Sequence, residues 1–202
     1  MNRLFLLVIS VACALGAGAV EIKDVFSAMP DSVLPTLTRN NRLDMVDFMA
    51  SGMKAEVNDV FDGKATLDTL TADYLHLTLS EAVKVEMKLL QSSEALADTS
   101  DCVVCVVMTY GIKPKESSVR MFTSKWSPLP VPGFSRGGNV ARLSPSSTDL
   151  TLQPIELIEY REEGEKIQQN GGDFSLITFK WNGKEYNNNY KYNIYSTLRV
   201  IL

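Results

Sequence analysis

The stretch CVVCVVMTY, residues 102–110, decides the fold. It is apolar along most of its length and rich in β-branched valine, which favours an extended strand covered on both faces. Gly111 and Pro114 follow and end the run. We therefore predict the central strand of a sheet. Because residues three apart in a strand point to opposite faces, the thiols of Cys102 and Cys105 are expected on opposite faces of that sheet.

The C-x-x-C spacing of these two cysteines is also found in redox and metal sites. A redox pair needs its first cysteine at an exposed helix N-terminus, but valines flank both cysteines here. A zinc site needs about two further ligands, and the chain has one histidine and, outside the leader that contains Cys13, no third cysteine. We expect buried free cysteines, no metal and no cofactor, with a disulfide as the alternative.

Alternating apolar and polar residues predict a hairpin before this strand. In YLHLTLS (74–80) and VKVEMKL (83–89), the apolar residues share one face, and the polar residues of the second segment, Lys84, Glu86 and Lys88, are expected to point outward. The short connection between the two segments suits a hairpin.

Further strands are expected toward the C-terminus. SVRMFTSKW (118–126) returns beside the central strand, LTLQPIELIEY (150–160) belongs to a later strand-rich zone, and FSLITFKW (174–181) follows with Ile177, Phe179 and Trp181 on one face. The NGKEY segment (182–186) begins with an Asn-Gly hairpin signal.

The pattern from Glu21 to about Met53 is helical. Pro30 is expected in a first helical turn. Asn40 or Asn41 is expected to cap a helix. Its apolar stripe is expected to be Leu43, Val46, Met49 and Met53. Asp44 and Asp47 fit either a pair of acting carboxylates or a solvated helix face.

We predict an α+β fold, in which short N-terminal helices pack on a mainly antiparallel sheet and a strand-rich C-terminal portion follows. The expected parts are a signal peptide (1–19), a helical segment plus antiparallel sheet (20–127), a Pro/Gly/Ser-rich loop (128–145), C-terminal strands in the same domain or a small second one (146–186), and an atypical tail (187–202).

The leader MNRLFLLVISVACALGAGA combines a basic start, a short apolar run and an A-x-A site, which indicates a secretory signal peptide cleaved after Ala19. A lipid anchor on Cys13 is the alternative. The apolar run is shorter than the roughly 20 residues that span a membrane, so no transmembrane segment is expected. The net charge is −4, without basic clusters, which disfavours nucleic acid as a partner.

One string, GFSRG (133–137), matches the G-x-S-x-G nucleophile elbow, which needs a strand before it and a helix after it. Here a proline-rich segment precedes it and Gly138 follows, so no catalytic residue is assigned. His76 lies on the polar face of its strand. We keep a set of candidates for a ligand or partner surface: Tyr74, His76, Phe134, Ser135 and Arg136.

Several motifs resemble an exported Bacteroidales family called domain of unknown function 3256. They are MPDSVLP (29–35), NNRLDMVDFM (40–49), SGMKAEV (51–57), LTADYL (70–75) and MTYG (108–111). The likeness extends from Ile22 to Leu129 and more weakly to WNGKEY (181–186), and the chain departs from the family pattern after Tyr186. The resemblance implies a location in the periplasm or outer envelope of a Gram-negative bacterium, and it implies no activity, substrate or cofactor.

From these features we expect an exported, non-catalytic envelope protein that binds an envelope protein or a surface glycan. The alternative is a hydrolase or a hydrolase inhibitor with a cleft between His76 and the loop at 128–139.

Overall fold

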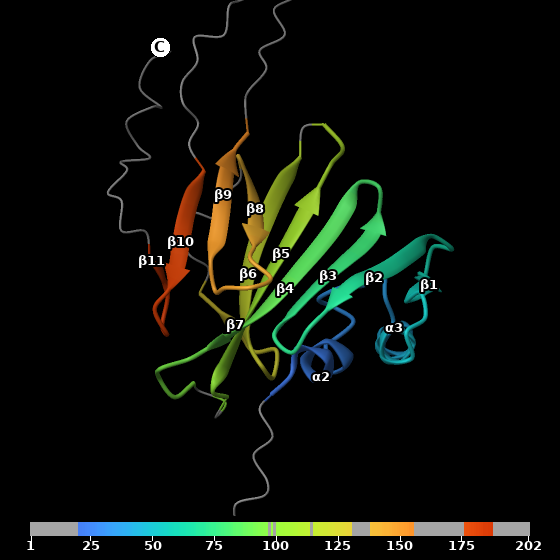
Figure 1. The fold of residues 1–202 in the computed structure, drawn as a ribbon, viewed down its shortest axis with the longest axis horizontal. Coiled ribbons are helices and arrows are strands. Elements are labelled where there is room, and N and C mark those ends of the chain that lie inside the picture. Colours follow the sequence, from blue (N-terminus) through green and yellow to red (C-terminus); the bar gives the residue numbers. More distant parts are fainter. Residues whose placement is uncertain are drawn as a thin grey trace, which may run out of the picture.

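The computed structural model describes residues 20–96, 98, 100–113, 115–130, 138–155 and 176–187. They form two antiparallel sheets and two short helices (Figure 1). The seven-stranded sheet runs in chain order: β1 (Glu56–Asn58), β2 (Lys64–Leu70), β3 (Tyr74–Ser80), β4 (Val83–Gln91), β5 (Cys102–Tyr110), β6 (Glu116–Thr123) and β7 (Pro128–Leu129). The four-stranded sheet has the order β11-β10-β9-β8: β8 (Asn139–Leu143), β9 (Leu150–Pro154), β10 (Ile177–Trp181) and β11 (Tyr186–Asn187).

The predicted α+β class is wrong, because the fold is β-rich. Helix α2 (Ile22–Ser27) has 6 residues and α3 (Arg39–Ala50) has 12, and strands dominate the rest. Pro30, expected in a first helical turn, lies instead in the turns that separate the two helices, where its carbonyl accepts from the amide of Val33. The helical zone is therefore two short helices separated by turns, and the helices lie at one end of the larger sheet (Figure 1).

Strand β5 lies inside the larger sheet, as predicted, paired with β4 and β6 along its length. Val104 and Val106 belong to the core that contains the buried helix residues, while Val103, Cys105 and Val107 belong to the core shared with the second sheet. Cys102 and Cys105 are both free and buried. Their places in an alternating strand confirm that the two thiols point to opposite faces.

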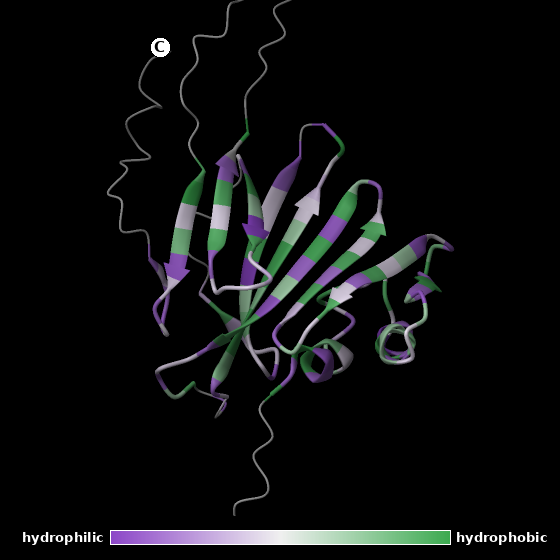
Figure 2. Cartoon of the chain, in the orientation of Figure 1, coloured by the Kyte–Doolittle hydropathy of each residue, from purple (hydrophilic) through white to green (hydrophobic). Residues whose placement is uncertain are grey.

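The expected hairpins are confirmed. Leu77 pairs with Val85 in the β3–β4 hairpin, and Figure 2 shows the alternation of apolar and polar residues along these strands. The β10–β11 hairpin turns at the Asn-Gly signal, where Gly183 has a φ of +96°. Phe179 on β10 is buried in the second core, and Ile177 and Trp181 pack against that core.

Helix α3 differs from its prediction in both cap and buried face. Thr38 is the N-cap, and its hydroxyl accepts from the amide of Asn41 while the Asn41 side chain accepts from the Thr38 amide. The buried residues are Arg42 and Met45, and Leu43 and Met53 of the expected stripe are exposed. The other two residues of the stripe, Val46 and Met49, pack against the core as expected. The apolar periodicity did not predict that charged Arg42 would face the core.

The prediction that Glu86 and Lys88 point into solvent is wrong. Glu86 is 9 % exposed and Lys88 is 2 % exposed, because the second sheet covers this part of the face. Lys88 is held by Asp73, with Nζ 2.8 Å from Oδ2, and donates to the carbonyl of Pro145 at 3.0 Å. Only Lys84, nearer the hairpin end, is exposed as expected.

Two strands, β7 and β8, lie within residues 128–145, where a loop was predicted. The described part of the chain contains no helix long and apolar enough to cross a membrane. The predicted leader, the string at 133–137 and residues 188–202 of the tail lie outside the described residues.

Candidate ligand-binding pocket

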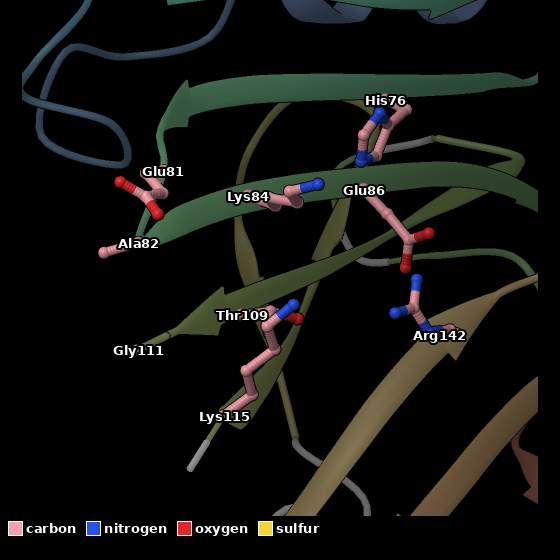
Figure 3. A pocket seen from close by; sticks show the side chains of 9 residues that line it. All are labelled: His76, Glu81, Ala82, Lys84, Glu86, Thr109, Gly111, Lys115 and Arg142. Carbon is pink, nitrogen blue, oxygen red and sulfur yellow. The ribbon is translucent and has the colours of Figure 1, made fainter. Parts of the chain in front are cut away.

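A shallow pocket opens where the second sheet stops covering the first. Seven polar or charged residues on four strands and two turns contribute to its lining: His76, Glu81, Lys84, Glu86, Thr109, Lys115 and Arg142 (Figure 3). Sheet register gathers them, because His76 is opposite Glu86 and Lys84 is opposite Thr109 on neighbouring strands. Arg142 is brought to the same place by β8, the nearest strand of the second sheet.

Glu86 is a fixed, buried carboxylate at the back of the pocket. Its Oε1 accepts from the Tyr74 hydroxyl at 3.1 Å, and its Oε2 accepts from the amide of Leu143 at 3.1 Å. Burial, together with the charge and hydrogen bond of Glu86, raises the pKa of Tyr74, so the phenol stays a donor. Figure 3 shows the guanidinium of Arg142 directed toward this carboxylate. Glu86 therefore joins the two sheets.

A β-bulge on β2 brings an acidic residue to the single histidine. The register of β2 against β3 shifts between Leu67 and Thr69, which leaves Asp68 as the extra residue. The Asp68 Oδ2 lies 3.1 Å from Nδ1 of His76 and accepts from the Thr78 hydroxyl at 2.7 Å. In a neutral imidazole, a proton on Nδ1 donated to Asp68 leaves Nε2 as an acceptor.

Three cations stand around the opening. Lys84, Lys115 and Arg142 are all exposed, and none of them forms an ion pair with the residues that the structure describes. Glu81, also in the lining, is exposed at the β3–β4 turn. Because Glu86 is buried and already bonded, the accessible charge of the pocket is more positive than negative.

The structure brings only part of the predicted surface together. His76 lines the pocket, while Tyr74 is buried behind it and contributes through Glu86. The other three candidates, Phe134, Ser135 and Arg136, lie outside the described residues. Sequence reasoning missed Glu86 and Arg142 as pocket residues.

The strand alternation already placed Glu86 on the same face as His76, which is the signal that would have found it. The contact of Asp68 with His76 depends on a bulge that strict alternation does not predict. Among the described residues, no group of three histidine, cysteine or acidic side chains could hold a metal ion. The Asp44 and Asp47 side chains lie on the exposed face of α3.

Comparison with known proteins gives a family and a fold. The model of the family described as "Protein of unknown function (DUF3256)" matches residues 14–161. A solved domain of an uncharacterized protein from Porphyromonas gingivalis W83 is similar with a TM-score of 0.58 and 18 % identity, over 85 % of this chain and 98 % of that one. At this identity the likeness concerns the fold alone. No curated protein matches the chain.

Proposed function

The chain belongs to the family described as Protein of unknown function (DUF3256), and we propose that it is an exported, non-catalytic envelope protein. It binds an anionic group of an envelope protein or surface component in the pocket beside His76. The observation that carries the proposal is the grouping of three exposed cations around one opening: Lys84, Lys115 and Arg142, of which Arg142 is also directed toward the buried carboxylate of Glu86. A bound carboxylate or phosphate would form charge-assisted hydrogen bonds with these cations.

The test is binding to anionic probes in solution. Full-length protein is titrated with soluble polyglutamate and polygalacturonate, and with dextran as the neutral comparison. Both anionic polymers are expected to bind more tightly than dextran, with an affinity that falls as salt rises. The double substitution Lys84→Met with Lys115→Met is expected to weaken anion binding about tenfold or more, the equivalent of roughly 1.4 kcal/mol.

The matched control is Lys54→Met with Lys180→Met, which removes the same charge from two exposed lysines outside the pocket, 73 % and 70 % exposed. It is expected to retain most of the binding. Equal weakening by the two double variants would show a general charge effect and would contradict a site.

Export is supported by the leader alone, which lies outside the described residues. Mass spectrometry of protein recovered from the native envelope is expected to find Val20 as the first residue. A lipid on Cys13, or an intact Met1, would contradict cleavage after Ala19.

The second candidate, a hydrolase, is favoured by one contact. An aspartate close to Nδ1 of a histidine favours the tautomer that a general base requires, and Oδ2 of Asp68 lies 3.1 Å from Nδ1 of His76. A panel of nitrophenyl esters, phosphates and glycosides tests it. Hydrolysis by the purified protein that is abolished by His76→Phe would replace the non-catalytic proposal.

A further inference from the structure

The pocket offers two kinds of polar group, and together they restrict the ligand. Lys84, Lys115 and Arg142 are donors that suit a carboxylate. His76, with Nδ1 engaged by Asp68, and the carboxylate of Glu81 are acceptors that need hydroxyl or amide donors from the ligand. A ligand that fits all of them carries a negative group with several donors close beside it.

The strands at the floor of the pocket have no free edge to which a peptide could add. Peptides commonly bind to sheets by adding a strand at an edge, but β3, β4 and β5 each have a paired neighbour on both sides. In the pocket wall, β8 is an edge strand, and the amide of its Leu143 is already donated to Glu86. A peptide therefore cannot add as a strand to the pocket floor, and recognition there relies mainly on side chains.

One of the acceptors, His76, has a carboxylate beside it before a ligand arrives. The bulge on β2 places Oδ2 of Asp68 3.1 Å from Nδ1 of His76, which favours a proton on Nδ1, and the Thr78 hydroxyl donates to the same carboxylate. Preorganised polar groups cost little ordering entropy on binding, which suits a small rigid ligand such as a sugar ring.

Building on the proposed function, we propose that the pocket binds an acidic saccharide, a sugar ring of the uronic-acid class. Its carboxylate is bound by Lys84, Lys115 and Arg142, and one of its hydroxyls donates to Nε2 of His76. An acidic peptide offers the carboxylates but not the adjacent ring hydroxyls. An acidic peptide is the alternative ligand, and the experiment has to distinguish it from an acidic saccharide.

The experiment compares trigalacturonate, a neutral galactose trisaccharide and triglutamate by calorimetry on the full, untagged chain. Trigalacturonate is expected to bind about tenfold or more tightly than either other probe, because only it satisfies both the cations and His76. The His76→Phe variant is expected to lose about tenfold for trigalacturonate and to leave triglutamate unchanged.

A second measurement does not depend on any variant. His76 is the only histidine in the chain, so its imidazole nitrogens give a single pair of signals in a ¹⁵N spectrum. Trigalacturonate is expected to shift the Nε2 signal in the direction of a nitrogen that accepts a hydrogen bond, whereas triglutamate leaves the Nε2 signal unchanged.

Equal affinity for triglutamate and trigalacturonate, with no shift of Nε2, would overturn the saccharide assignment and leave the anion-binding proposal standing. If neither anion binds, both proposals fail. Equal binding of the neutral and acidic trisaccharides would contradict the role that both proposals give to the cations.

Discussion

Arg42 shows how a single side chain organises the N-terminal segment. It is fully buried, and its guanidinium donates to the backbone carbonyls of Phe26, Leu37 and Met29 as well as to Asp31. Two short helices and the turns between them leave carbonyls without helical partners, and an arginine fork can satisfy several of them at once. Apolar periodicity cannot find such a residue, because the requirement comes from the backbone of distant residues.

Arg42→Met is therefore expected to lower the free energy of unfolding by about 3 kcal/mol or more, since it leaves several buried acceptors unpaired. Urea unfolding measures the loss. Arg39→Met, an exposed arginine on the same helix, is the control and should change stability by less than about 0.5 kcal/mol. Similar losses in the two variants would contradict the role of the buried guanidinium.

Among the elements, the β10–β11 hairpin connects the second sheet to the loop after β4. Gly183 turns it with φ +96°, and its carbonyl accepts from the amide of Ser93 at 2.8 Å. Lys184 adds an ion pair with Glu94, 3.1 Å between Nζ and Oε1, and the Trp181 indole donates to the carbonyl of Gln91 at 2.7 Å. The hairpin signal was readable in the sequence, but its partners were not, because they are about 90 residues away.

Gly183→Ala is expected to destabilise the protein by about 2 kcal/mol, since a Cβ there would lie 2.8 Å from Oγ of Ser93 in addition to adopting a positive φ. Thermal unfolding measures the change. Gly52→Ala shares the positive φ, at +68°, but its Cβ would meet nothing within 4 Å. It should therefore cost less, and an equal cost would show that the contact with Ser93 is unimportant.

Over the whole molecule, the two sheets meet at a layer that contains ionisable but neutral groups. Cys105 on β5 and Tyr186 on β11 belong to this core, and the two side chains interact. Burial and the nearby charge of Glu86, opposed by the hydrogen bond with Tyr186, raise the pKa of Cys105 to about 12. Burial also raises the pKa of Cys102, to about 11, and the pKa of Tyr186.

These shifts predict alkaline destabilisation. An unfolded thiol ionises near pH 8.5, while the folded thiols keep their protons, so the unfolding free energy falls as pH rises from there toward 11 to 12. The slope is at most about 1.4 kcal/mol per pH unit for each thiol. Urea unfolding under reducing conditions between about pH 8 and 10 measures it, and Cys105→Ala is expected to show a shallower slope than wild type. Identical slopes would contradict a neutral buried Cys105.

By itself the sequence determined strands β3 to β6, β9 and β10 and the turns of two hairpins. The valine run placed β5 in the interior of a sheet and put its two cysteines on opposite faces, because strand alternation is a local property of the backbone. It also placed His76 on a polar face. The family resemblance agrees with the matched family model.

Only the tertiary structure decided which polar face is covered and where a pocket remains. Alternation marks Glu86 and Lys88 as polar but does not say that a second sheet, built from residues after 138, will bury them. The bulge at Asp68 and the position of Arg142 likewise depend on packing between segments far apart in the chain. The β-rich class follows from the same cause: long-range pairing, and not local propensity, sets how much of the chain becomes sheet.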